Sequence, residues 1–417
     1  MRKNEIKSLL ISSKYPPEYS GSGLRAHRTY KRLVQKFNIT FDVLCSSEEY
    51  TTCRRYSYEG IKVQRIASKI FPHIVVEESS EVDGSFWRRF IKGAKYRTNY
   101  MWEAFLTFIY LFRVKKKYDL FHIFGKSNVN SSAILFAKLF HKPVLIELCN
   151  EMDNPHQYEP FLIRKVFGER FPKDSVIVCI SERLKRVCQK YGYTENIWCR
   201  PNPVDEQRFF INKKNKYLLR RKYTKFSKDD ILLVYISKFI PRKNQIFLLE
   251  IMRKLPDKYK LLLAGPIIER GPLLERDKKY FESIKSKMKE YKLDNRIQVI
   301  PRFIEEVDEY IKMSDVYLFP PKWEGLGTIM LESIACGIPV VAVRIEGITD
   351  IWIKDGKNGY LSKLDAGEFA QKVELALKIE EEDILRCSED ILRKYSTNEI
   401  DRRYFELICK LVYGDCD

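Results

Sequence analysis

The sequence lacks the clusters of cysteine and histidine that hold metal ions. Its ten cysteines are scattered, with no Cys-x-x-Cys pair and no histidine at the spacing of a metal ligand beside them. We therefore expect no metal site. The scattered cysteines also favour reduced thiols, which is the state found in a cytosolic compartment.

A hydrophobic run long enough to cross a bilayer is also lacking. The apolar stretch from Tyr100 to Phe112 is much shorter than the roughly 20 residues that a spanning helix needs. The start, MRKNEIKSLLISSKYPP, becomes polar too soon for a signal peptide. With 45% hydrophobic residues, the composition is typical of a soluble globular protein, and we expect a cytoplasmic location.

Acidic residues are outnumbered by basic ones, 56 against 75, which leaves a formal net charge of +19 and a pI near 9.3. Such an excess favours an anionic partner: a nucleic acid, a phosphorylated small molecule or an acidic lipid surface. The charge does not distinguish among these three.

A chain of 417 residues is long for one hydrophobic core, and its pattern divides into two similar α/β halves. Short apolar runs typical of parallel strands alternate with longer amphipathic stretches. The expected strands are residues 6–12, 41–46, 120–125, 143–148, 175–181, 197–201, 231–237, 260–265, 297–301, 316–320 and 339–343. Two prolines and a charged run interrupt the pattern at PNPVDEQRFFINKKNK. We predict Rossmann-like domains at 1–203 and 204–395, and a helix in 396–417 that crosses back to the N-terminal domain.

The turn PPEYSGSGLRAHRTY contains only part of a dinucleotide-binding fingerprint. Gly21 and Gly23 follow a predicted strand and precede a helix, where small residues allow the backbone to approach an anion. Ala26 replaces the third glycine of G-x-G-x-x-G, so the pattern does not predict a dinucleotide site. A tight turn without a ligand is the alternative.

The stretch PKWEGLGTIMLESIACGIPVVAV places two carboxylates around a glycine-rich turn. Glu324 lies at the turn, and a helix is predicted over residues 326–335. Glu332 lies in this helix among apolar residues, four positions after Thr328 and on the same face. A carboxylate there is unfavourable unless it is hydrogen-bonded, and the ribose of a nucleotide would satisfy it. The alternatives are a helix-start acid for Glu324 and a satisfied or surface acid for Glu332.

The two acids have the spacing Glu-x7-Glu, and four other stretches before and after them along the chain belong to the same comparison. They are VIVCISERLKRVCQKYG…WCRPNPVDEQRFF, LVYISKFIPRKNQIFLLEIMRKLP, VIPRFIEEVDEYIKMSDVYLFP and VRIEGITDIWIKDGKNGYLSK. Together these stretches resemble the retaining glycosyltransferases of the GT-B fold, in particular glycosyltransferase family 4, over nearly the whole chain. The resemblance implies an α/β protein of GT-B type, with two Rossmann-like domains facing each other across a cleft.

The resemblance also implies a mechanism. The C-terminal domain would bind a nucleotide-sugar donor and the N-terminal domain a carbohydrate or lipid-linked glycan acceptor, and the sugar would be transferred with retention of configuration, without metal or cofactor. Glu324 would hold the sugar and Glu332 the ribose, while two lysines stabilise the departing diphosphate. The implied catalytic residues are Glu324, Lys238 and Lys243, and the implied donor-binding residues are Gly21, Ser22, Gly23, Gly325, Leu326, Gly327, Thr328 and Glu332.

Several positions depart from the family pattern or leave a role open. Ser237 replaces a usual glycine, and Lys238 stands where arginine is more common, which keeps the charge but loses the bidentate fork. Cys149 and Asn150 stand where many members have a histidine directed at the donor sugar, so the identity of the sugar stays open. His122, in a predicted strand, is either a core residue or a site residue.

Residues 86–117 combine nine Lys and Arg with ten aromatic residues and a single acid. This composition would suit an interfacial surface on anionic lipid at the inner face of a membrane, with a lipid-linked glycan as acceptor. The alternative is a core-facing helix pair with a solvated basic face.

Two other classes of function stay open. A nucleic-acid-binding protein is supported by charge alone, because no recognised nucleic-acid motif is present, and the transferase would need no nucleic acid. Another nucleotide-dependent α/β enzyme, such as a dehydrogenase, would lack its glycine fingerprint. A metal-dependent transferase of the other common fold would need an internal Asp-x-Asp, and the only one, at residues 415–417, ends the chain.

Overall fold

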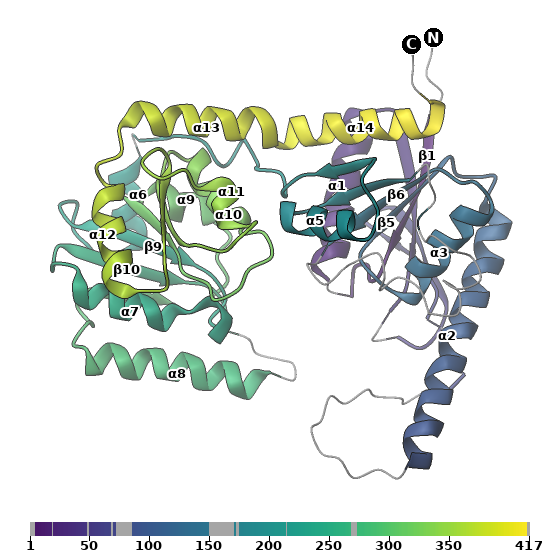
Figure 1. Ribbon diagram of the computed structural model, residues 1–417, viewed down its shortest axis with the longest axis horizontal. Coiled ribbons are helices and arrows are strands. Elements are labelled where there is room, and N and C mark those ends of the chain that lie inside the picture. Colours follow the sequence, from purple (N-terminus) through teal and green to yellow (C-terminus); the bar gives the residue numbers. More distant parts are fainter. Residues whose placement is uncertain are drawn as a thin grey trace. The chain divides into compact units, whose positions relative to one another are not determined.

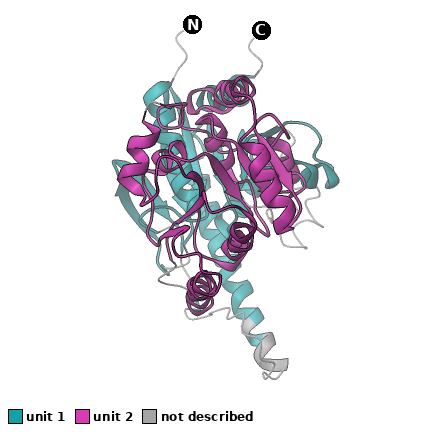
Figure 2. Cartoon of the chain, turned by 90° about the vertical axis from the view of Figure 1, so that its left-hand side faces the viewer, with its two compact units in different colours: residues 1–180, 184–200, 401–417 teal, residues 181–183, 201–400 magenta. Residues whose placement is uncertain are grey.

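The computed structural model contains two compact units, each built on its own β-sheet (Figures 1 and 2). Unit 1 comprises residues 1–180, 184–200 and 401–417, and unit 2 comprises residues 181–183 and 201–400. The structure describes residues 5–18, 20–47, 50–67, 70–71, 86–149, 171, 175–213, 215–267 and 273–414.

Unit 1 has an eight-stranded sheet in the order β3-β4-β2-β1-β5-β6-β7-β8. Its strands are β1 Ile6–Ser12, β2 Ile39–Cys45, β3 Arg54–Tyr58, β4 Ile61–Arg65, β5 Leu120–Phe124, β6 Val144–Leu148, β7 Val176–Cys179 and β8 Ile197–Cys199. Adjacent strands are parallel except β3 and β4, which form an antiparallel hairpin. Because β2 and β5 pair with opposite edges of β1, the order of strands reverses there, and ligands of such sheets bind at that reversal.

The helices of unit 1 are α1 Gly21–Lys36, α2 Phe86–Val114, α3 Asn128–Leu139, most of α5 Glu182–Lys190 and most of α14 Thr397–Tyr413. Ser20 caps α1 by accepting a hydrogen bond from the Gly23 amide at 2.9 Å. Residues 86–114 form one continuous helix, so the alternative of a helix pair in this segment is wrong. Among the described residues, no helix is both long enough and apolar enough to cross a membrane.

The last helix, α14, packs into unit 1 through buried polar groups. The Asp401 carboxylate is fully buried and accepts hydrogen bonds from Arg32 at 3.0 Å and Lys36 at 2.7 Å. One turn further along, Tyr404 bonds to Glu147 of β6, which also pairs with the buried Arg200 at 2.7 Å. Buried charges are tolerated only when they are paired, so this network requires α14 in its observed place.

Unit 2 has a six-stranded, fully parallel sheet in the order β11-β10-β9-β12-β13-β14. Its strands are β9 Ile231–Ile236, β10 Tyr259–Ala264, β11 Ile297–Ile300, β12 Val316–Phe319, β13 Val340–Val343 and β14 Gly359–Ser362. Its helices are α6 Lys216–Tyr223, the 3-10 turn η2 Pro241–Lys243, α7 Gln245–Lys254, α8 Leu274–Glu290, α9 Val307–Lys312, α10 Thr328–Ala335, α11 Thr349–Trp352, α12 Ala366–Ala376 and α13 Glu381–Tyr395. The strands are almost entirely buried apolar residues, as expected for a parallel sheet covered on both faces. The order of strands reverses between β9 and β12.

Every strand expected from the sequence is present, but β3, β4 and β14 were not expected. The β3–β4 hairpin turns at Glu59 and Gly60, which both have positive φ, and its strands contain exposed polar residues between partly or fully buried ones. Such edge strands have no continuous apolar run, and β14 has only four residues. Sequence patterns of hydrophobicity therefore did not reveal them.

Candidate active site

The expected catalytic residues of unit 2 lie in two loops that follow neighbouring strands. One loop follows β9 and carries Ser237 and Lys238 before η2, and the other follows β12 and spans residues 320–327 before α10. Because β9 and β12 are adjacent and parallel, both loops leave the carboxyl edge of the sheet at its reversal point. This is the position at which open α/β sheets bind ligands.

Backbone and side-chain hydrogen bonds join the two loops. The Lys322 amide donates to the Arg242 carbonyl at 3.0 Å, and the Asn244 side chain donates to the Pro320 carbonyl at 3.2 Å. Asn244 has a left-handed conformation with φ of 60°, which asparagine tolerates better than most residues. The pairing holds the loop with Glu324 against the loop with Lys243.

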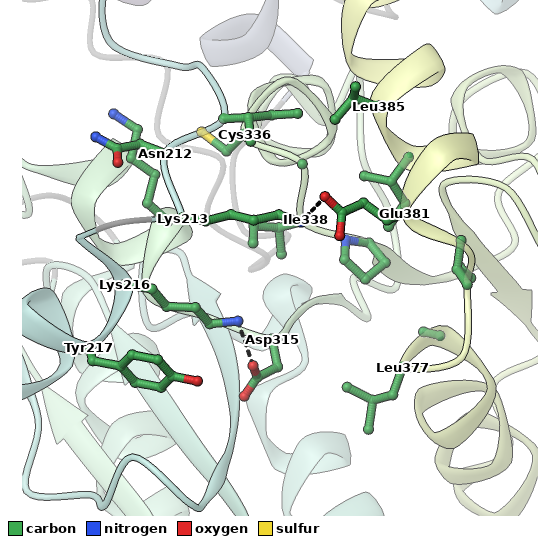
Figure 3. Close-up of a pocket in the computed structure, with 17 residues that line it drawn as sticks. Asn212, Lys213, Lys216, Tyr217, Asp315, Cys336, Ile338, Leu377, Glu381 and Leu385 are labelled. Carbon is green, nitrogen blue, oxygen red and sulfur yellow. Dashed lines mark hydrogen bonds and ion pairs between the residues drawn. The ribbon is translucent and has the colours of Figure 1, made fainter.

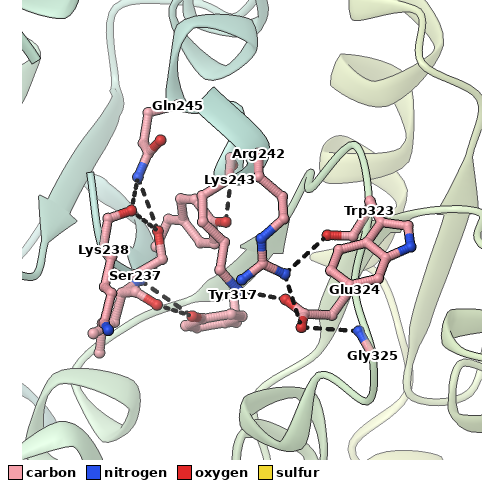
Figure 4. A network of polar contacts seen from close by, with 11 residues as sticks. Ser237, Lys238, Arg242, Lys243, Gln245, Tyr317, Trp323, Glu324 and Gly325 are labelled. Carbon is pink, nitrogen blue, oxygen red and sulfur yellow. Dashed lines mark hydrogen bonds and ion pairs between the residues drawn. The ribbon is translucent and has the colours of Figure 1, made fainter. Parts of the chain in front are cut away.

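Glu324 is the centre of a cationic cluster (Figure 4). Its carboxylate accepts hydrogen bonds from Lys243, from Arg242 at 3.4 Å and from the Gly325 amide at 3.0 Å. Burial by itself would raise the pKa of Glu324, but the charge and hydrogen bond of Lys243 outweigh it and lower this pKa below its usual value. Glu324 is therefore held as a carboxylate, with fixed orientation.

Lys238 has a different environment from Lys243. Gln245 donates to the Ser237 hydroxyl at 2.9 Å and to the Lys238 carbonyl at 2.8 Å, which fixes the backbone before the side chain of Lys238. The Lys238 side chain is exposed, and no residue in the described ranges forms an ion pair with it. Lys238 is therefore available to an anionic ligand without breaking an existing pair.

Two residues of this cluster were missed in the sequence. Arg242 contacts Glu324, and its guanidinium also lies 5.1 Å from the centre of the Trp323 ring, which is 43% exposed. Arg242 directly precedes Lys243 in the sequence, and Trp323 directly precedes Glu324. This adjacency was the only sequence feature that could have indicated them as site residues. Arg242 and Lys243 are consecutive residues of η2, and both contact the same carboxylate.

The second acid of the motif, Glu332, lies in α10. This helix begins at Thr328, later than expected, after Gly327 in a left-handed conformation with φ of 70°. The Thr328 hydroxyl accepts a hydrogen bond from Asn202 at 3.1 Å. Burial raises the pKa of Glu332 from its usual 4.5 to about 7, with Arg208 opposing this rise. In the described part of the chain no hydrogen-bond donor contacts the Glu332 carboxylate. Its oxygens are therefore able to accept hydrogen bonds from a ligand.

Gly21, Ser22 and Gly23 lie at the start of α1 in unit 1, so they follow β1 and do not share a unit with the acids. A Cβ on Gly23 would lie 2.2 Å from the Lys14 carbonyl oxygen, whereas a Cβ on Gly21 would meet nothing within 4 Å. A close backbone contact thus accounts for Gly23. Packing does not account for Gly21.

This difference gives a test of the two glycines. We expect Gly23→Ala to lower the free energy of unfolding by roughly 1–3 kcal/mol, because the Lys14 backbone must shift. Gly21→Ala should be neutral or stabilising by up to about 1 kcal/mol, because alanine reduces the entropy of the unfolded chain. Urea denaturation of both variants makes the comparison, and equal destabilisation by both would contradict it.

The residues that depart from the family pattern lie elsewhere in unit 1. Cys149 is buried and donates to the Glu147 carbonyl at 3.6 Å, while Asn150 lies outside the described residues. His122 is fully buried in β5 and forms a hydrogen bond with Tyr30 at 2.9 Å. Burial lowers the pKa of His122 well below its usual value, with a further effect from Arg200, so His122 is a neutral core residue.

Unit 2 also has a hollow of about 440 Å³ at the opposite edge of its sheet (Figure 3). Asp315 and Pro339, which precede β12 and β13, line it. Its three lysines are already paired: Lys213 with Glu381, Lys216 with Asp315 at 2.6 Å, and Lys312 with Asp308 at 3.1 Å. We therefore place the candidate active site at the Glu324 edge. Across the described ranges, no three His, Cys, Asp or Glu residues group closely enough to hold a metal ion.

The fold is the GT-B fold. The chain superposes on the crystal structure of Anabaena Alr3699/HepE in complex with UDP with a TM-score of 0.69, at 13% identity, covering 97% of this chain and 99% of that one. Residues 218–390 match the family described as Glycosyl transferases group 1, so the chain carries a domain of this family. The predicted fold class is thereby confirmed, and over residues 218–390 the match agrees with the predicted glycosyltransferase resemblance.

Two curated proteins illustrate the relationship. The N-acetyl-alpha-D-glucosaminyl L-malate synthase of Bacillus anthracis is 26% identical over 49% of this chain and 51% of its own. The UDP-Gal:alpha-D-GlcNAc-diphosphoundecaprenol alpha-1,3-galactosyltransferase of Escherichia coli is 23% identical over 45% of this chain and 47% of its own. The matches span about half the length of these relatives. They favour the glycosyltransferase over a nucleic-acid-binding protein or a dehydrogenase.

Proposed function

We propose that this protein is a retaining glycosyltransferase that moves a sugar from a nucleotide-sugar donor to an acceptor hydroxyl without a metal ion. The observation that carries the proposal is the cluster of Glu324 with two cations, eight residues before Glu332, at the reversal point of a sheet in a group 1 glycosyltransferase domain. The solved relative named above contains UDP, which supports a nucleotide ligand.

In this proposal, the bond between the anomeric carbon and the diphosphate oxygen breaks while a bond to the acceptor oxygen forms on the same face. The acceptor proton passes to the departing phosphate oxygen, so no separate general base is needed. Lys238 and Lys243 stabilise the negative charge that develops on the diphosphate. Glu324, ionised and oriented by its cations, accepts hydrogen bonds from sugar hydroxyls, and Glu332 accepts them from the ribose.

The proposed acceptor is a lipid-linked glycan or a surface polysaccharide, with the N-terminal unit as its binding domain. The galactosyltransferase relative is named for a diphosphoundecaprenol substrate, which supports a lipid-linked acceptor. A peripheral position on an anionic membrane surface belongs to the same proposal.

A panel of nucleotide sugars, screened by thermal shift and by release of nucleotide diphosphate, tests the proposal. We expect one donor to raise the melting temperature, because binding to the folded state alone stabilises it. The same donor should be slowly hydrolysed, and hydrolysis should persist in EDTA. A protein that responds to no nucleotide sugar in the panel would refute the proposal.

The two lysines should contribute similarly to nucleotide binding but unequally to the stability of the protein. We expect Lys243→Ala and Lys238→Ala each to weaken binding of the nucleotide diphosphate by roughly 1.5–3 kcal/mol, as for a charge-assisted hydrogen bond. The double variant should lose less than the sum, because both cations serve one diphosphate. Only Lys243→Ala should also lower stability, since it removes the partner of Glu324. Calorimetry with Lys254→Ala, an exposed lysine at the end of α7, as control makes the comparison, and wild-type affinity in both variants would remove the lysines from the site.

A further inference from the structure

Helix α2 has an unusual distribution of side chains in unit 1. Three of its buried side chains are polar, Asn99, Glu103 and Thr107, and Leu111 continues the same face. Asn99 exchanges hydrogen bonds with the Phe71 backbone at 2.9 and 3.0 Å, and Glu103 accepts one from Asn128 at 2.8 Å. The inward side of the helix therefore combines these polar contacts with apolar packing, because four partly buried side chains pack against the core of unit 1: Leu106, Phe108, Tyr110 and Val114.

The outward face of the same helix is apolar. Met101, Phe105 and Phe112 are 71%, 55% and 57% exposed, and their spacing of four and seven residues puts them on one stripe. Leu139 and Phe140, at the end of α3, are also exposed, and the Phe140 ring lies 5.8 Å from that of Phe112. We call these five residues the α2 outer surface. An exposed apolar cluster of this kind marks an interaction site.

Positive charge borders the α2 outer surface. Arg97, Arg113 and Lys116 are exposed, and among the described residues none of them forms an ion pair. Lys115 lies over both rings of the cluster, 4.1 Å from Phe112 and 4.4 Å from Phe140. The only acid between residues 86 and 117 is Glu103, which is buried. Arginine and lysine beside exposed aromatic and aliphatic side chains are the pattern of a helix that lies in the interface of an anionic bilayer.

We propose that the α2 outer surface inserts into the headgroup region of an anionic phospholipid membrane, with the adjacent cations on lipid phosphates. A protein partner would need acidic groups to match these cations, and a second copy of this chain would place like charges against each other. The location deepens the proposed function, because it would bring unit 1 to the membrane in which a lipid-linked acceptor resides.

The test uses the full chain in co-sedimentation with vesicles of phosphatidylcholine alone and of phosphatidylcholine with phosphatidylglycerol. We expect binding to the anionic vesicles to be at least tenfold stronger, and to weaken in high salt because ions screen the phosphates. The variant Met101→Ser/Phe105→Ser/Phe112→Ser should lose at least tenfold in binding. The matched control is Tyr217→Ser/Leu218→Ser, which removes two exposed apolar side chains of α6 in unit 2 and should bind normally.

Several outcomes would overturn the proposal. These are equal binding to both kinds of vesicle, normal binding by the triple variant, or a wild-type dimer in solution that the triple variant converts to monomers without any vesicle binding. The substituted side chains are exposed, so the melting temperature should stay unchanged and show that the variants fold. Nucleotide-sugar thermal shifts on the same samples separate the two proposals. Vesicle binding without a nucleotide-sugar response would refute the proposed transferase function and support membrane binding by the α2 outer surface.

Discussion

Glu324→Gln is expected to lower sugar transfer on the order of 100-fold while leaving affinity for the nucleotide diphosphate nearly unchanged. The substitution keeps the size of the side chain but removes the charge that Lys243 and Arg242 now compensate. If Glu324 acts on the sugar as bonds break, the loss falls on the transition state and therefore on turnover. Lys243 would lose its partner and become more available to phosphate, so nucleotide binding should not weaken.

The control for this experiment is Glu282→Gln, which removes an exposed acid from α8. Turnover of the donor and affinity for the diphosphate should be measured on both variants, together with the melting temperature. If Glu324 is only a structural partner of the cations, its substitution should lower stability and leave the kinetics of the folded fraction intact. That outcome would remove Glu324 from the catalytic role.

Glu332→Gln is expected to have opposite effects on stability and on binding. Because the pKa of Glu332 rises from 4.5 in an exposed chain to about 7 in the folded protein, the folded state binds a proton that the unfolded state has released. Wild-type stability should therefore fall as the pH rises from about 4.5 to about 7, and the loss should be complete above that range. The glutamine variant has no such loss and should be more stable than wild type at pH 8, by up to about 3 kcal/mol.

Nucleotide binding should respond in the other direction. An ionised carboxylate accepts hydrogen bonds from both ribose hydroxyls, and replacing it with an amide should weaken nucleotide diphosphate binding roughly tenfold to 100-fold. Wild-type affinity should rise between pH 6 and pH 8 as Glu332 ionises, and this rise should be absent in Glu332→Gln. Urea denaturation and calorimetry at both pH values measure the two effects.

A more stable variant that binds nucleotide less well would identify Glu332 as a residue kept for function at the expense of stability. If the substitution instead lowers stability at pH 8 and leaves affinity unchanged, Glu332 is a packed helix acid and not a ribose ligand.

Local patterns were sufficient for much of the fold, whereas the candidate site residues came largely from the family resemblance. The alternation of apolar runs and amphipathic stretches predicted two Rossmann-like halves, because strands buried on both faces must be apolar along their length. The Glu-x7-Glu spacing and the stretch with Lys238 and Lys243, through the family resemblance, predicted residues in the segments that follow β9 and β12 of unit 2. The edge hairpin β3–β4 escaped prediction because one of its two sides is exposed and charged.

The sequence by itself identified two acids, two lysines and a glycine turn between a strand and a helix as candidate site residues, but not Arg242 or Trp323. Only the tertiary structure decided how they act on one another, since Lys243 and Glu324 are 81 positions apart and meet because β9 and β12 are neighbours. The raised pKa of Glu332 likewise depends on burial in the folded chain. The same holds for α2. The sequence showed its basic and aromatic residues, but its buried face includes contacts with residues distant in the chain, among them hydrogen bonds to Phe71 and Asn128. Such contacts cannot be predicted from the periodicity of the helix.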